Sequence, residues 1–97
     1  LDRLRLTGAR VVRGDAVATL AQEAAAGRKY DLVLVDPPYD VYLDLQQRLA
    51  RHLPAVVAPD GVVVVETEAR VEPELPLPLR TSRKYGQTRI SVFEATA

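Results

Sequence analysis

The stretch YDLVLVDPPY, residues 30–39, is the strongest indicator of the fold of this chain. Residues 32–35 form an unbroken apolar run, which predicts a strand over residues 30–36 that is buried on both faces, as in a parallel sheet covered by helices. Residues 36–39 then place a carboxylate, two prolines and an aromatic ring where the strand meets a loop. Because open α/β sheets bind ligands beyond the carboxyl ends of their strands, we expect a functional site here.

Four residues give this site its chemistry. The Asp36 carboxylate and the Pro37 carbonyl accept hydrogen bonds, while Pro37 and Pro38 fix their φ angles and stiffen the loop. Tyr39 offers a ring face for base stacking, which is worth about 1–3 kcal/mol per base. The complementary ligand is the exocyclic amine of a nucleobase, because it carries two N–H donors.

Methyl transfer is the reaction that fits such a site. An aryl amine is a poor nucleophile because its lone pair is delocalised into the ring. Accepting its protons at Asp36 and Pro37 frees that pair for attack on a sulfonium methyl, provided that the base is unpaired or flipped out. We therefore predict Asp36, Pro37, Pro38 and Tyr39 as catalytic residues. The alternative makes Asp36 a turn residue that caps the next helix and Tyr39 an ordinary half-buried ring.

The flanking sequence predicts alternating strands and helices. A β-branched segment predicts a strand over residues 10–13, and Asp15 can cap a helix whose apolar face begins at Val17 and ends before Gly27. The later elements follow from apolar periodicity and from the placement of Pro and Gly. They are a helix marked by Val41, Leu45 and Leu49, a turn at 58–61, a buried strand over 62–66, an extended loop over 71–79, and an antiparallel hairpin of strands 79–84 and 88–95 joined at 85–87.

Composition limits the possible functions. The 97 residues make one small domain, and 13 basic and 13 acidic residues give a net charge of zero. The absence of cysteine and the single histidine, His52, exclude thiolate and multi-histidine metal sites, so we expect no metal, and they fit a cytoplasmic protein. No apolar run is long enough to span a membrane. Because the sequence begins at Leu1 rather than Met, we expect a piece of a longer protein.

Three segments resemble one family of enzymes. Residues 30–39 resemble the fourth motif of amino-group methyltransferases that use S-adenosylmethionine. The segment RKYGQT, residues 83–88, is similar to the ending of the bacterial methyltransferases that act on guanine N2 of small-subunit (16S) ribosomal RNA. The segment LTGARVVRGDA, residues 6–16, is similar to the third strand and turn of that family.

The resemblance implies an α/β fold, the Rossmann-like sheet of class I methyltransferases with strand order 3-2-1-4-5-7-6. Residues 1–97 would be the C-terminal portion of that single domain and would supply strands three to seven, ending in the antiparallel hairpin. Strand three should then lie two strand positions away from strand four, with nothing between them.

The resemblance also implies roles for particular residues. It assigns Asp15, Ala16 and Asp36 to the S-adenosylmethionine site, with Asp15 at the adenine amino group, and residues 36–39 to the target base. The expected partner is ribosomal RNA or the small ribosomal subunit. Three residues of the late hairpin are expected to approach that RNA: Arg83, Lys84 and Tyr85.

The glycine-rich loop and the ribose-binding acidic residue of the family have no counterpart in these residues, so the chain alone should bind cofactor weakly and be inactive. Three alternatives stay open. The motif equally fits a methyltransferase of adenine N6 in DNA. The run before Asp36 also resembles a phospho-receiver strand, with Lys84 as its late lysine, although only Asp15 is found of the acidic pair that receivers need. The third alternative is a Rossmann-like module without catalysis.

Overall fold

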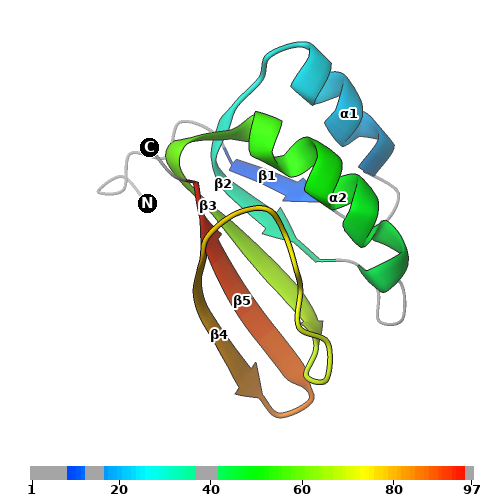
Figure 1. Ribbon diagram of the computed structural model, residues 1–97, viewed down its shortest axis with the longest axis vertical. Helices are drawn as coiled ribbons and strands as arrows, with labels where there is room; N and C mark the ends of the chain where they lie inside the picture. The colour runs from blue at the N-terminus through cyan, green and yellow to red at the C-terminus, as the bar shows by residue number, and fades with distance from the viewer. Residues whose placement is uncertain (1–8, 13–16, 37–41, 96–97) are drawn as a thin grey trace.

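The computed structural model describes residues 9–12, 17–36 and 42–95, which form a mixed α/β fold (Figure 1). The elements along the chain are β1 (Ala9–Val12), α1 (Val17–Ala25), β2 (Tyr30–Val35), α2 (Tyr42–Val56), β3 (Val57–Glu68), β4 (Leu79–Tyr85) and β5 (Thr88–Glu94). Each predicted helix and strand is present, and Gly27 follows α1 with a φ of 76°, as expected of a helix-terminating glycine.

The five strands form one sheet in the order β1-β2-β3-β5-β4. β1, β2 and β3 run parallel, whereas β5 runs antiparallel to both β3 and β4. The order β2-β3-β5-β4 is the expected order 4-5-7-6, and the closing antiparallel hairpin is confirmed. Its two-residue turn contains Gly86 at a φ of 63°, a conformation that glycine adopts at little cost.

The position of β1 differs from the expectation of a two-strand gap. β1 pairs directly with β2, with Ala9 opposite Leu32 and Val12 opposite Val35. The physical reason is that a bare edge of β2 would leave a row of backbone N–H and C=O groups unpaired, and β1 satisfies them.

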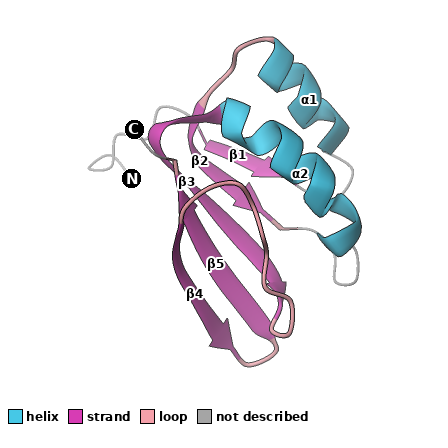
Figure 2. Ribbon diagram, in the orientation of Figure 1, coloured by secondary structure: helices cyan, strands magenta, loops and turns pink. Residues whose placement is uncertain are grey.

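Both helices lie on the same face of the sheet, where α1 packs beside α2 (Figure 2). α2 contributes an apolar stripe to the core: Tyr42, Leu45, Leu49, Leu53 and Val56. Against these helices lie fully buried Val33, Val63 and Phe93, which share one row across β2, β3 and β5. The hydrophobic effect on this face holds the helices to the sheet.

The expectation that β2 is buried on both faces is wrong for the described residues. Burial alternates along β2 and β3: Val33 and Val35 are buried, whereas Leu32, Leu34 and Val64 are only partly covered. The reason is that α1 and α2 cover one face only, so that an apolar run produces alternate burial in spite of its continuous sequence.

The expected turn at residues 58–61 is instead a bulge inside β3. Tyr30 pairs with Val57 and Leu32 with Val62, so five residues of β3 advance against two of β2. Asp60 has a φ of 66° within this bulge. A Cβ added to Gly61 would lie 2.7 Å from Val57 Cγ1 and 2.8 Å from the Ala58 carbonyl oxygen, so this tight path requires glycine.

Candidate active site

Asp36 lies directly after the last residue of β2 and is exposed to solvent. Its neighbour Val35 pairs with Val12 of β1 on one side and with Val65 of β3 on the other. All three strands are parallel, so Asp36 stands at the carboxyl edge of the sheet, where ligands of open α/β sheets bind. An exposed carboxylate at this edge can accept hydrogen bonds from an N–H donor.

The other predicted residues of the motif and of the cofactor site cannot be compared with the structure. Pro37, Pro38 and Tyr39 lie outside the described residues, as do Asp15 and Ala16. Asp36 is therefore the one member of both predicted sets that the structure places.

The hairpin brings the predicted RNA-contacting residues to the same edge of the sheet. Val65 pairs with Ser91, and the next row joins Glu66, Ile90 and Arg83. Arg83 thus stands level with Glu66, the residue after Val65. Asp36 is the residue after Val35, the partner of Val65, so it stands level with the same row. Three strand spacings of about 4.8 Å separate β2 from β4, so the two backbones lie roughly 14 Å apart.

Lys84 and Tyr85 continue from Arg83 toward the hairpin turn, and all three are exposed. Tyr85 exposes 58% of its surface, which is high for a large aromatic side chain. Arg83 and Tyr85 alternate with Lys84 along β4, so one cation and the aromatic ring share a face of the sheet. A cation beside an aromatic ring has the composition of a surface that contacts a phosphate backbone and stacks on a base.

A buried arginine near this edge was missed by the sequence analysis. Arg89 of β5 is 8% exposed and lies on the helix-covered face in the same alternation as Ser91 and Phe93. Its Nε donates to the Ala69 carbonyl at 2.9 Å, and one terminal nitrogen donates to Ser82 Oγ at 2.8 Å. The sequence did contain a signal: Arg89 precedes Phe93 by four residues, and in a strand with alternating side chains this places both on the same face of β5.

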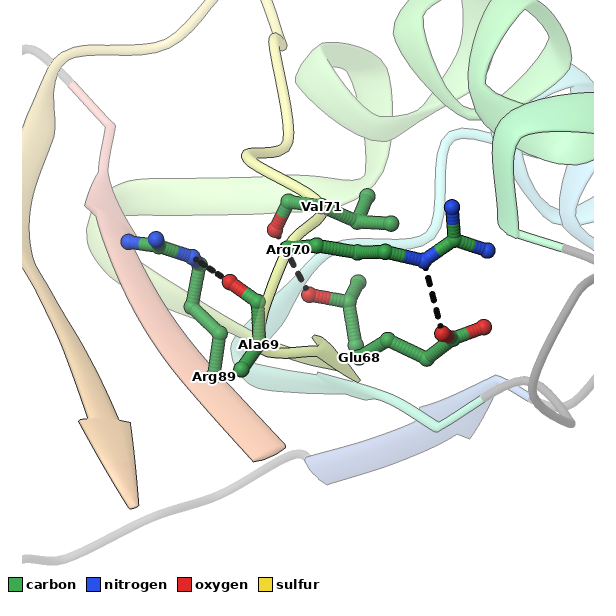
Figure 3. Close-up of polar contacts among 6 residues, drawn as sticks. Glu68, Ala69, Arg70, Val71 and Arg89 are labelled. Carbon is green, nitrogen blue, oxygen red and sulfur yellow. Dashed lines mark hydrogen bonds and ion pairs between the residues drawn. The ribbon is translucent and has the colours of Figure 1, made fainter. Parts of the chain in front are cut away.

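The segment after β3 forms a compact turn around these bonds (Figure 3). The Val71 amide donates to the Glu68 carbonyl at 2.9 Å, and Thr67 Oγ1 donates to the Val71 carbonyl at 3.0 Å. The Ala69 amide donates to the Gln87 carbonyl at 2.8 Å, which joins this turn to the hairpin turn. The hydrogen bonds of Arg89 and the hydrogen bond from the Ala69 amide thus fix the two turns relative to each other.

The loop that follows is attached to the start of α2. The Glu74 amide donates to Gln46 Oε1 at 2.8 Å. Tyr42, the first residue of α2, is 4% exposed, and its hydroxyl has no hydrogen-bond partner in the described structure. Burial, with a smaller contribution from the Glu74 charge, raises the pKa of the Tyr42 phenol.

The described ranges hold no group of three or more His, Cys, Asp or Glu side chains placed to bind a metal ion. None of the helices in the described part of the chain is long and apolar enough to cross a membrane.

The mixed sheet with both helices on one face is a partial α/β fold similar to that of methyltransferase structures, as comparisons with known proteins show. The family model described as Conserved hypothetical protein 95 matches residues 1–94, and the chain belongs to this family. A comparison with curated protein sequences gives no match.

Solved structures share the fold. "Putative methyltransferase yhhF from Escherichia coli" is 25% identical with a TM-score of 0.68, over 84% of this chain and 46% of that protein. A hypothetical protein of Thermus thermophilus is 25% identical with a TM-score of 0.61, over 80% and 43%. The rRNA methyltransferase aviRa from Streptomyces viridochromogenes is 23% identical with a TM-score of 0.62, over 80% and 35%, and this likeness concerns the fold alone. The chain thus spans less than half the length of each of these three proteins.

Proposed function

We propose that this chain is the C-terminal portion of a cytoplasmic, S-adenosylmethionine-dependent methyltransferase that modifies the N2 amine of a guanine in small-subunit ribosomal RNA. The observation that supports this most is the exposed Asp36 at the carboxyl end of β2, in a chain of a family whose structural neighbours include a putative methyltransferase. A carboxylate buried in the core would have excluded the proposal.

Asp36 and the Pro37 carbonyl accept hydrogen bonds from the two N–H groups of the target amine and so direct its lone pair along the line of attack. Pro38 restricts the loop, and Tyr39 stacks on the base. The cofactor supplies a methyl group on a sulfonium sulfur. Once it has accepted that methyl group the amine nitrogen would be acidic, and Asp36 would take its proton or pass it to solvent.

The same edge supports the RNA partner. Arg83 and Lys84 neutralise phosphates, and Tyr85 stacks on an unpaired base beside the target. These contacts lie on β4, whereas Asp36 follows β2. The residues that position the RNA are therefore separate from the residue that takes part in methyl transfer.

Because the chain spans 46% of the length of the first solved structure, we propose that the activity belongs to a longer protein. The 97-residue chain alone binds S-adenosylmethionine weakly and transfers no methyl group, because the glycine-rich loop of the cofactor site has no counterpart in it. Calorimetric titration of the chain tests this: micromolar affinity contradicts it.

Nucleoside analysis tests the substrate. The full-length protein is incubated with S-adenosylmethionine and, in separate reactions, with small ribosomal subunits, naked small-subunit rRNA and adenine-containing duplex DNA. We expect N2-methylguanosine from an RNA substrate and no N6-methyladenine. Methylated adenine in DNA without methylated guanine in RNA would instead establish the alternative substrate.

A further inference from the structure

Two turns border a shallow, open cleft at the carboxyl edge of the sheet. The cleft has a volume of about 340 Å³ and is lined by Glu68, Ala69 and Arg70 of the turn after β3 and by Gly86 and Gln87 of the hairpin turn. Its volume lies within the ordinary range of small-ligand sites, about 300–1,000 Å³. None of these five residues belongs to the predicted catalytic, cofactor-binding or RNA-contacting sets.

The walls of the cleft are fixed without a ligand. The Ala69 amide bonds to the Gln87 carbonyl and joins the two turns, and the buried Arg89 holds the Ala69 carbonyl. Figure 3 shows Arg89 and Arg70 extending to opposite sides of the turn, with Arg70 directed toward the Glu68 carboxylate. A preformed cleft avoids the entropy cost of ordering its walls when a ligand binds.

The chemistry of the cleft suits a nucleotide. Arg70 Nε donates to Glu68 Oε2 at 3.0 Å, which orients a guanidinium whose side chain is 77% exposed. The exposed Gln87 and Gly86 add further polar groups, and a Cβ built on Gly86 meets no atom within 4 Å, so ligand atoms can approach the backbone there. Exposed Tyr85 immediately precedes this turn and offers a stacking surface.

A second cleft of similar size provides a contrast. It measures about 370 Å³, lies between the loop after β3 and the β4–β5 hairpin, and is lined by two carboxylates, Glu72 and Glu74, with Ser82 and Ser91. Two carboxylates repel a phosphate, and arginine is not among its lining residues. The cleft beside Arg70 holds one carboxylate, Glu68, which is paired with the Arg70 guanidinium, so of these two clefts it is the one that repels a phosphate less.

The cleft lies near the proposed reaction centre. Glu68, Thr88 and Tyr85 form one row of the sheet, two residues beyond the row of Glu66. Asp36 follows Val35 and so stands level with Glu66 on the neighbouring strand. Two residues along a strand and one or two strand spacings across it correspond to roughly 10 Å, within reach of the next nucleotides of a single strand.

Building on the proposed function, we infer that the cleft between Glu68–Arg70 and Gly86–Gln87 binds a nucleotide that flanks the methylated guanine. Arg70 contacts its phosphate, and Gln87 and the Gly86 backbone contact its polar edges. The site therefore contributes to the selection of the RNA strand and to its register, whereas methyl transfer takes place at Asp36.

Substitutions at one position test the site through charge. In the full-length protein, Gln87→Glu keeps the shape of the side chain and adds a negative charge, and Gln87→Lys adds a positive one. We expect Gln87→Glu to raise the KM for small-subunit rRNA roughly tenfold with kcat within about twofold, and Gln87→Lys to lower KM. The control Gln47→Glu puts the same charge on the exposed side of α2 and should leave both constants unchanged.

A second pair covers the case in which a Gln87 variant does not fold. Asn and Asp adopt the positive φ of Gly86 more readily than most residues, both find open space there, and the backbone strain is common to the two variants. Gly86→Asp should raise the KM for RNA well above that of Gly86→Asn. A photo-crosslinking amino acid at position 87 should attach to a nucleotide next to the methylated guanine.

The outcomes separate the two proposals. The cleft assignment would be overturned by equal KM values for Gln87→Glu and Gln47→Glu, or for the Gly86 pair, in an enzyme that still makes N2-methylguanosine. The proposed function would then still stand. A crosslink far from the methylated guanine would have the same consequence. A full-length protein that methylates no guanine in rRNA would remove the proposed function and the cleft assignment together.

Discussion

The parallel half of the sheet and the hairpin half are held by different forces, although they share one helix-covered face. Under the helices, Val33 of β2 and Val63 of β3 are fully buried apolar side chains. Toward the turn of the hairpin, the same face carries Ser82, Ser91 and Arg89, joined by hydrogen bonds. Hydrophobic burial thus sets the position of the strands, whereas a polar network sets the position of the turns that border the site.

The change with the greatest consequence concerns chemistry. Asp36→Ala in the full-length enzyme should reduce kcat at least about a hundredfold, because it removes the proton acceptor at the reacting amine, while leaving the melting temperature close to that of the wild type since Asp36 is exposed. Asp44→Ala, which removes an exposed carboxylate from α2, is the control. An unchanged rate for Asp36→Ala would contradict the assignment of this edge as the active site.

The second effect is on the apolar half. Leu49 of α2 is fully buried among the core side chains, so Leu49→Ala should lower the free energy of unfolding by about 3 kcal/mol through lost burial and the cavity left behind. Urea denaturation of the full-length protein measures it, with exposed Leu43→Ala as the control. Equal losses for the two variants would mean that α2 does not supply the core.

The third effect is on the polar half. Arg89→Met keeps an apolar stem but removes both bonds of the guanidinium, so the free energy of unfolding should fall by about 2 kcal/mol. Hydrogen exchange should locate the change: the Ala69 amide, which bonds to Gln87, should exchange faster, and the amides of α2 should not. A uniform loss of protection would show that the two halves are not separately held.

The last and smallest effect is a gain in stability. The Tyr42 hydroxyl is buried without a partner in the described structure, and a buried unsatisfied polar group destabilises a fold by about 1–3 kcal/mol. Tyr42→Phe should therefore raise the free energy of unfolding by about 1 kcal/mol, measured by thermal denaturation. A loss of stability would show that the hydroxyl has a partner in the full-length protein.

Local pattern was sufficient to predict the helices, the hairpin and the place of Asp36. It mispredicted residues 58–61, because a turn signal of Pro, Asp and Gly is also compatible with a bulge when β2 offers backbone partners on both sides of it. It also missed Arg89, because a charged residue in an alternating strand reads as solvent-facing unless the partner face is known.

The identity of the strands and helices, and the carboxylate that follows β2, can be read from the residues alone, because apolar periodicity, glycine and proline act over a few residues. The pairing of β1 with β2, the covering of one face by both helices and the bond from Arg89 to the turn after β3 emerge only when the chain is folded. Those features depend on which distant backbone edges and side chains meet, and a hydrogen bond between segments 20 residues apart leaves no local periodicity to read.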